Sequence, residues 1–169
     1  MLDHQRALGS KSQLSDISTG RAEVVATATL TVETPGEGFV DITAEAKSFV
    51  RAAGAGDGML FLFIRHTSAS LVIQENADPD VRTDLVTALR RLAPSNAGWV
   101  HDVEGPDDMP AHVKSMLNGV SLQIPVSGGD LALGTWQGIY VAEHRSSPHP
   151  REVVLQFCGS CAHSDRASN

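Results

Sequence analysis

Four histidines have sequence contexts suited to catalysis or metal binding: His66, His101, His112 and His144. Asp108 precedes His112 by four residues, and this spacing places a carboxylate and an imidazole on one face of a helix. His112 would lie near the start of that helix, where the helix dipole favours the neutral, metal-binding imidazole. The pair therefore predicts a metal-ligand set or a shared hydrogen bond. Taken singly, each histidine is better explained as an ordinary surface or core residue.

A second polar cluster follows an expected strand and includes Glu75, Asn76, Asp78 and Asp80. Oxygen ligands of this kind suit Mg²⁺, which often keeps several waters while it contacts substrate phosphates. Helix capping accounts for Asp78 and Asp80 without any ligand, because Asp78 precedes Pro79 at an expected helix start. Capping does not account for Glu75 and Asn76, which remain candidates for binding.

The segment GTWQG lies within a pattern otherwise typical of a strand and leads to Glu143, His144 and Arg145. Glycines inside a strand suggest a bulge or the close approach of a ligand. Arg145 could hold a phosphate or carboxylate group with its planar guanidinium. The alternative is a surface ion pair between Arg145 and Glu143 or Glu152.

The only cysteines, Cys158 and Cys161, form a C-x-x-C pattern near the end of the chain. A redox-active pair usually opens a helix, whereas this pair follows an expected strand, so we interpret it as incidental. The chain has no glycine-rich phosphate loop, no nucleophile elbow and no dinucleotide-binding fingerprint.

Patterns along the chain predict the elements that must position these residues. Strands are expected over 23–34 and 39–43, and over 59–64 as an apolar run buried on both faces of a sheet. Helices are expected after Thr43 as N-cap and after Asp78, and a short helix over 109–117. The chain becomes apolar again at 71–73. Three further strands are expected at the ranges 120–126, 130–144 and 151–159, with a Gly-Gly hairpin turn before the strand at 130–144.

The order of these elements predicts an α+β fold, a largely antiparallel β-sheet packed with two to three helices. We expect one domain over 21–160, a flexible arm over 1–20 and a C-terminal tail over 161–169. The region 95–110 is expected to be a long loop, and such loops inside compact domains are usually functional.

Length and composition limit the possible partners. The chain has 169 residues, 41% of them hydrophobic, and a formal net charge of −7. This acidic balance argues against a nucleic-acid partner and against an anionic membrane surface. No apolar run approaches the roughly 20 residues that cross a bilayer, and the N-terminus lacks the features of a secretory signal. With two cysteines only, we expect a reducing cytoplasmic location.

Three ordered blocks resemble the YjbQ family of small bacterial and archaeal proteins: FIRHTSASLVIQENADPDVRTDL, DDMPAHVKSMLNGVSLQIPV and GDLALGTWQGIYVAEHR. They lie within 59–145, about half of the chain. The resemblance implies an α+β subunit that forms a homotrimer with clefts near the subunit boundaries. It also implies a secondary thiamine-phosphate synthase, which joins a pyrimidine diphosphate to a thiazole phosphate and releases pyrophosphate.

The resemblance carries over to individual positions. His66 and Thr67 match the histidine-threonine pair of the family pattern, and Ser68 replaces a second threonine while keeping the hydroxyl. Asp108 and His112 match the D-x-x-x-H helix. The remaining matches are the acidic patch, at Glu75, Asn76 and Asp78, and the end of the GTWQ strand, at Glu143 and Arg145.

Together these observations predict a cleft ringed by His66, His101 and His112, with Asp108 as a metal ligand or as the group that orients an imidazole. Nitrogen ligands suit Zn²⁺ and oxygen ligands suit Mg²⁺, so either divalent metal ion is compatible. We expect His66, His112 and Arg145 to be catalytic.

Phosphate binding is expected from a set of polar side chains: Thr67, Ser68, Glu75, Asn76, Glu143 and Arg145. A metal ion and Arg145 would stabilise the leaving pyrophosphate. One alternative is a non-catalytic trimeric protein that binds a metal or a small anion. Another is hydrolysis or transfer on a different phosphorylated metabolite by a metal-activated water.

Overall fold

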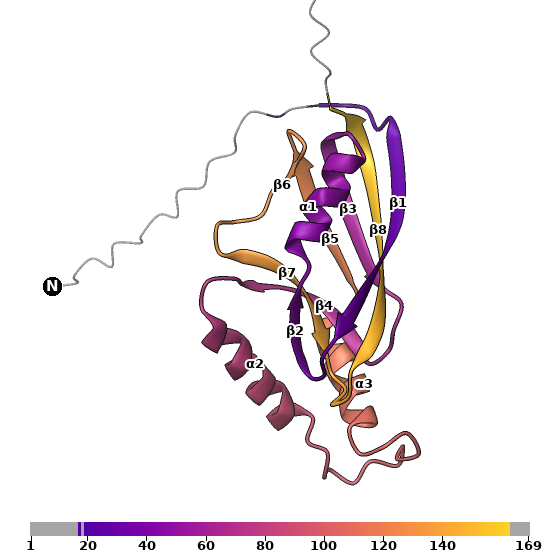
Figure 1. The fold of residues 1–169 in the computed structure, drawn as a ribbon, viewed down its shortest axis with the longest axis vertical. Helices are drawn as coiled ribbons and strands as arrows, with labels where there is room; N and C mark the ends of the chain where they lie inside the picture. The colour runs from indigo at the N-terminus through magenta and orange to yellow at the C-terminus, as the bar shows by residue number, and fades with distance from the viewer. Residues whose placement is uncertain (1–16, 18, 163–169) are drawn as a thin grey trace, which may run out of the picture.

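The computed structural model describes residue 17 and residues 19–162, which form an α+β fold with two antiparallel sheets and three helices (Figure 1). This confirms the predicted fold class. The expected arm over 1–20 and the expected tail over 161–169 lie largely outside the described residues.

The larger sheet has five strands, and every neighbouring pair in it is antiparallel. Its longest strands pair over their whole common length, from Val24 opposite Gly159 to Thr34 opposite His149. In spatial order the strands are β1 (Val24–Thr34), β8 (His149–Cys161), β3 (Ala55–Ile64), β5 (Ser121–Ser127) and β6 (Asp130–Leu131).

The smaller sheet has three strands with β7 at its centre. Its register places Ala69 opposite Glu143 at one end and Glu75 opposite Gln137 at the other. In spatial order the strands are β2 (Gly38–Asp41), β7 (Gln137–Glu143) and β4 (Ala69–Glu75).

Only one face of β3 is buried, so the expectation of a strand covered on both faces was wrong. Leu60, Leu62 and Ile64 are at most 1% exposed, whereas Phe61 is 40% and Phe63 is 49% exposed. The apolar run hides this alternation because both sets of positions are hydrophobic. β3 is internal in its sheet, and α1 and the smaller sheet pack against one face of it.

Helix α1 (Thr43–Ala52) packs its buried residues Ala46 and Val50 into the core. Thr43 is the first helical residue and not the N-cap, which corrects the sequence-based prediction. Its hydroxyl instead accepts a hydrogen bond from the Ile139 N–H at 2.8 Å, which ties α1 to β7.

Helix α2 (Pro79–Leu92) begins where the sequence predicts, with the Asp78 side chain accepting the Asp80 N–H at 2.8 Å. None of its residues is buried. Figure 1 shows α2 beside β2, displaced from the two sheets. Its apolar stripe is therefore only partly covered within this subunit.

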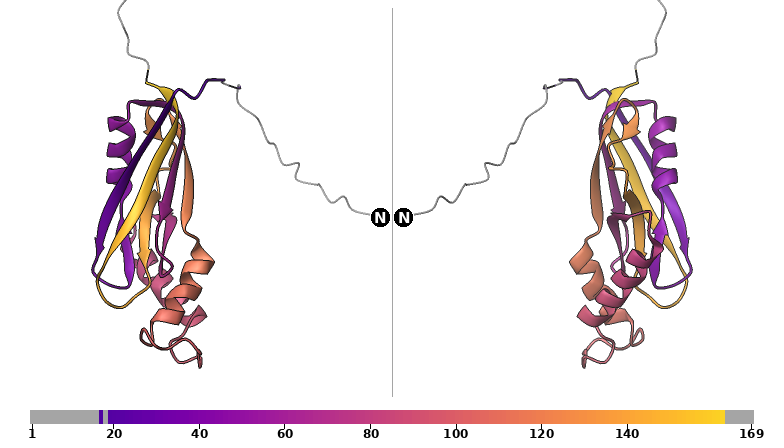
Figure 2. Two further views of the ribbon diagram at one scale, coloured as in Figure 1. Left: turned by 90° about the vertical axis from the view of Figure 1, so that its right-hand side faces the viewer. Right: turned by 90° about the vertical axis from the view of Figure 1, so that its left-hand side faces the viewer.

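Helix α3 (Asp108–Asn118) packs against β4 and follows the long loop that the sequence predicts. Figure 2 shows α2, α3 and this loop gathered at the end of the molecule opposite the start of β1 and the end of β8. This end carries most of the polar residues singled out from the sequence. No helix among the described residues is long and apolar enough to cross a membrane.

The strand expected over 130–144 is broken in the structure. β6 ends at Leu131 in the larger sheet, and β7 begins at Gln137 in the smaller sheet. The Gln137 side chain accepts the Gly134 N–H at 2.8 Å. Trp136 is consequently 65% exposed and does not share a strand face with the buried Tyr140. Of the two glycines of GTWQG, Gly134 lies in this turn, whereas Gly138 lies in β7 opposite Gln74.

Candidate metal centre

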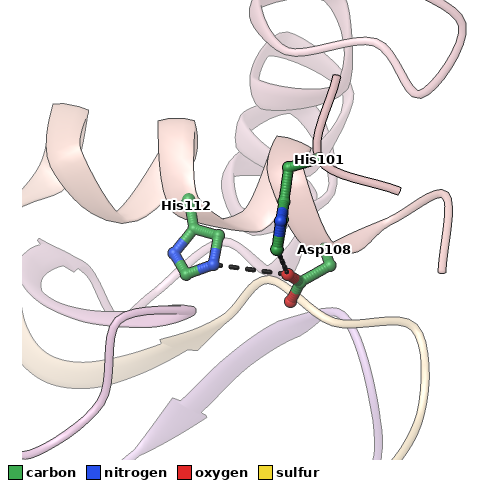
Figure 3. Close-up of side chains that lie close together, drawn as sticks. All are labelled: His101, Asp108 and His112. Atoms are coloured by element: carbon green, nitrogen blue, oxygen red, sulfur yellow. Dashed lines mark hydrogen bonds and ion pairs between the residues drawn. The ribbon is translucent and has the colours of Figure 1, made fainter. Parts of the chain in front are cut away.

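Helix α3 and the loop before it bring His101, Asp108 and His112 together (Figure 3). The Nε2 atom of His101 lies 2.8 Å from Asp108 Oδ2, and the Nε2 atom of His112 lies 3.3 Å from the same oxygen. The ligand atoms of all three residues lie within 4.8 Å of one another. The predicted juxtaposition of Asp108 and His112 is confirmed, and His101 joins them from the loop.

Asp108 is only 2% exposed, and its two oxygens have different partners. Its Oδ1 accepts a hydrogen bond from the Arg145 guanidinium. Its Oδ2 faces both imidazoles. Arg145 therefore fixes the carboxylate so that one oxygen is presented to the two histidines.

The tautomer of His112 follows from its second ring nitrogen. Nδ1 lies 3.1 Å from the Thr67 carbonyl oxygen, which can only accept a hydrogen bond, so Nδ1 carries the proton. The lone pair of Nε2 is then free to bind a metal. A backbone carbonyl that orients the other ring nitrogen is a common feature of metal-binding histidines.

The donor set fits a transition metal better than Mg²⁺. Two ligand atoms of a tetrahedral zinc site with bonds of about 2.0–2.1 Å lie about 3.3 Å apart, close to the spacing between His112 and Asp108. Two imidazoles and one carboxylate are typical Zn²⁺ ligands, whereas Mg²⁺ prefers oxygen. The side chains of His101 and His112 are 45% and 34% exposed, so a fourth position would face solvent.

Arg145 does not present a free guanidinium. Its Nε donates to Asp107 Oδ2 at 3.3 Å, and its Nη2 donates to the Glu104 carbonyl at 2.8 Å, in addition to its contact with Asp108. Burial opposes ionisation of Asp107, but hydrogen bonds from Ser146 and Arg145 outweigh it and lower its pKa to about 2. These contacts indicate a positioning role for Arg145.

Glu143 and His66 belong to a neighbouring buried network. Glu143 is 1% exposed and accepts two hydrogen bonds from Arg151, at 2.6 and 2.5 Å. His66 Nε2 accepts the Glu152 N–H at 2.9 Å, and Nδ1 lies 3.4 Å from the Arg151 guanidinium. Burial and the Arg151 charge lower the pKa of His66.

The structure therefore does not bring His66 into the cluster with His101 and His112, contrary to the expected ring of three histidines. Among the described residues, the group suited to a metal contains only the three side chains of Figure 3. His66 is linked to that group indirectly, since the next residue, Thr67, orients His112 through its carbonyl oxygen.

Two shallow hollows lie on either side of Thr67. One of about 390 Å³ is lined by His112, Ser115 and Met116, and another of about 570 Å³ is lined by His66 and Ser68. Both hollows are also lined by Thr67 and Val120. The predicted residues Thr67 and Ser68 thus lie beside the histidines, at the surface.

Glu75 and Asn76 lie at the opposite end of the smaller sheet. Glu75 is six residues along β4 from Ala69, which pairs with Glu143, and this corresponds to a separation of about 20 Å. The Asn76 amide donates to the Gln137 carbonyl at 3.4 Å. A single subunit does not bring this acidic patch to the triad.

Sequence reasoning missed Arg151, the buried partner of Glu143. The sequence contains a pattern that could have identified it. Alternate residues of β8 face the core, and these are Arg151, Val153, Leu155 and Phe157. A charged residue in the inward register of an apolar strand requires a buried partner. The cysteines of β8 are free, with Cys158 half-buried and Cys161 exposed.

Comparisons with known proteins agree with this fold. A family model described as "UPF0047 protein YjbQ-like" matches residues 28–160. The UPF0047 protein sll1880 of Synechocystis is 45% identical over 131 residues, which cover 77% of this chain and 89% of that protein. The YjbQ protein of Escherichia coli O157:H7 is 41% identical over 132 residues, covering 78% of this chain and 96% of that protein.

Solved structures give the same result. A conserved hypothetical protein from Thermus thermophilus is 39% identical with a TM-score of 0.69, covering 77% of this chain and 98% of that one. A hypothetical protein from Aeropyrum pernix is 32% identical with a TM-score of 0.74, covering 80% and 99%. The chain therefore belongs to the UPF0047 family of YjbQ-like proteins.

Proposed function

We propose that this protein is a metal-dependent enzyme acting on a phosphorylated small molecule. The observation that carries the proposal is the convergence of His101, Asp108 and His112 at a solvent-facing position. The orientation of Asp108 by Arg145 and of His112 by the Thr67 carbonyl supports it. Ligands that are held before the metal arrives lose little freedom on binding.

The reaction we propose is the one that the family resemblance implies, the joining of a pyrimidine diphosphate to a thiazole phosphate. Its difficult step is cleavage of the carbon–oxygen bond to pyrophosphate, while the thiazole nitrogen attacks the carbon. A zinc-like ion, when bound, would supply positive charge for the departing phosphate oxygens. No nucleophilic side chain is needed.

The residues of this chain would act mainly by binding and orientation. The hydroxyls of Thr67 and Ser68 lie beside the histidines and are suited to donate hydrogen bonds to phosphate oxygens. Arg145 would act through Asp108 and not on the phosphate, because its donors already contact acidic and carbonyl groups. His66 would shape the neighbouring hollow.

We also propose a homotrimer, in which residues far from the triad in one subunit could reach the site of a neighbour. Glu75 and Asn76 are the residues for which this matters, since they lie at the other end of β4. In a trimer, the phosphorylated metabolite would be bound near a subunit boundary. The proposed location is the cytoplasm.

Metal content and synthase activity of purified protein test the proposal together. His112→Ala should remove both near-stoichiometric metal and activity, whereas His149→Ala should leave both unchanged. His149 is a suitable control because it is a histidine whose Nδ1 contacts the Ser147 carbonyl, outside the triad. Metal binding without turnover would favour a non-catalytic metal-binding protein. Turnover without metal would contradict the proposal.

A further inference from the structure

A polar cavity of about 390 Å³, distinct from the two hollows beside Thr67, lies on the other side of α3 from His101 and His112. Pro110 and Lys114 line it, and each is two residues from a helix position that carries a triad side chain, a rotation of about 200° around the helix. Its other walls come from the turn after β1, the end of α2 and the turn after β7, and include Glu37, Arg90 and His144. The cavity is thus separate from the proposed metal centre.

Lys114 gives this cavity a buried positive charge. The residue is 4% exposed, and its Nζ donates to Glu37 Oε1 at 2.6 Å. An ammonium group has three N–H donors, and this is the hydrogen bond that Lys114 makes with the described residues. Two donors are left for a group inside the cavity.

His144 contributes a further donor. It is 2% exposed, and its Nε2 lies 2.7 Å from the Ser70 hydroxyl. The Ser70 hydroxyl is fully buried, and His144 Nε2 is its hydrogen-bond partner among the described residues, so we assign the hydroxyl as donor and the ring proton to Nδ1. Among the described residues, no fully buried side-chain nitrogen or oxygen lacks a hydrogen-bond partner. His144 Nδ1 has no such partner among these residues, so this atom is not fully buried. Because His144 lines the cavity, a ligand in the cavity can contact Nδ1.

The charges around the cavity favour an anion. Arg90 also contacts Glu37, at 2.7 Å, so one carboxylate is shared by two cations. The other acidic wall residue, Asp107, is already matched by the Arg145 guanidinium. Burial, followed by the charge of Lys114, lowers the pKa of His144 to about 4, so its imidazole is neutral near pH 7 and serves as a hydrogen-bond donor.

We propose that this cavity is a binding site for a small oxyanion, phosphate or carboxylate, held by the ammonium of Lys114 and the Nδ1–H of His144. Glu37 acts as the internal competitor of that ligand, because it occupies part of the hydrogen-bonding capacity of Lys114 and Arg90. This site does not depend on the metal centre.

Calorimetric titration of the full chain with inorganic phosphate tests this site. Lys114→Gln should weaken phosphate binding about tenfold, the effect of losing one charge-assisted hydrogen bond. Glu37→Gln should strengthen it, since the competitor is neutralised. His149→Ala should leave it unchanged, because His149 belongs neither to the lining of the cavity nor to the triad. Titration with acetate, with the same variants, distinguishes a carboxylate ligand from a phosphate ligand, and either result supports the proposal.

Three results would overturn it: no binding of either oxyanion by the wild-type chain, binding that Lys114→Gln and Glu37→Gln leave unchanged, or binding that His112→Ala abolishes. If circular dichroism shows that Lys114→Gln does not fold, Glu37→Gln decides alone, because only a ligand competing with that carboxylate gains affinity. Loss of metal binding in His112→Ala would test the proposed function alone. It would not change how the phosphate titrations of Lys114→Gln and Glu37→Gln are interpreted.

Discussion

Asp108 is the residue on which the candidate metal centre converges. One of its oxygens is held by Arg145, and the other faces His101 and His112. The nearly complete burial of Asp108 keeps this carboxylate in one orientation. The proximity of Asp108 and His112 was predictable from helical spacing. The position of His101 was not, because it depends on the conformation of a loop whose sequence has no periodic pattern.

Replacing Asp108 by Asn should weaken Zn²⁺ binding at least about tenfold, because the amide keeps the shape of the side chain but loses the charge that attracts the cation. Competition with a chromophoric chelator measures this affinity. Asp102→Asn is the matched control, since Asp102 is an exposed carboxylate in the loop before α3. Equal loss of affinity in both variants would show that nonspecific charge, and not the triad, holds the metal.

His144 makes stability depend on pH. Its pKa is about 4 in the folded chain and about 6.5 when unfolded, so below pH 6.5 the unfolded chain binds a proton that the folded chain rejects. The free energy of unfolding should therefore fall by roughly 3 kcal/mol as the pH decreases from 6.5 to 4. Stability is fully present above pH 6.5.

Urea unfolding at pH 7 and pH 4.5, in buffer free of phosphate, measures this loss. The variant His144→Gln lacks the titrating ring and should lose less stability over the same interval. His66, whose pKa is also lowered, contributes in the same direction in both proteins. An identical loss in wild type and variant would assign the pH dependence to other groups.

At the scale of elements, the helix starts and tight turns that depend on neighbouring residues were predictable from the sequence. Asp78 and Pro79 begin α2 as expected, and Gly128 and Gly129 form the β5–β6 turn with positive φ angles of 57° and 82°. The exposed face of β3 could not be predicted, because Phe61 and Phe63 are as hydrophobic as the residues between them. Only the arrangement of the two sheets decides which face is covered.

The candidate site was predictable to a similar extent. Spacing within one helix joined Asp108 and His112, but the separation of His66 from them depends on the pairing of β3 with β8, which directs His66 toward Arg151 and Glu152. The separation of Glu75 likewise follows from the register of β4 with β7. Register between distant strands leaves no simple mark in the sequence.

The pairing of β3 with β8 depends on a close contact between Gly58 and Gly159. A Cβ atom added to Gly159 would lie 2.3 Å from the Asp57 carbonyl oxygen and 2.8 Å from the Gly58 Cα. Gly159→Ala should therefore lower the free energy of unfolding by about 1–3 kcal/mol, the cost of overpacking. Gly20→Ala is the control, because nothing lies within 4 Å of its added Cβ. Equal melting temperatures of the two variants would show that the sheet accommodates the methyl group.

At the scale of the whole molecule, two apolar surfaces are not covered by any of the described residues. One is the outer face of the larger sheet, where Val25 on β1 is 70% exposed, and Phe61 and Phe63 on β3, two strands away, are 40% and 49% exposed. The other is α2, which has no buried residue. Exposed apolar patches of this kind often mark protein–protein interfaces.

The proposed homotrimer predicts a solution mass three times the 17.9 kDa of the chain. Light scattering coupled to size-exclusion chromatography measures this mass directly. Phe61→Lys should shift the population toward the monomer if the outer face of the larger sheet is the interface, because a buried unpaired charge is costly. Phe61 is already 40% exposed in the isolated subunit, so folding should be retained. A wild-type mass of one chain would contradict the trimer.

The position of a bound metal tests the central claim most directly. An anomalous difference map of crystals grown with one equivalent of Zn²⁺ would locate the ion. We predict a peak about 2.0–2.2 Å from the Nε2 atoms of His101 and His112 and from Asp108 Oδ2. A map with no peak between these three side chains, or with zinc only at another position, would contradict the assignment of this cluster as the metal centre.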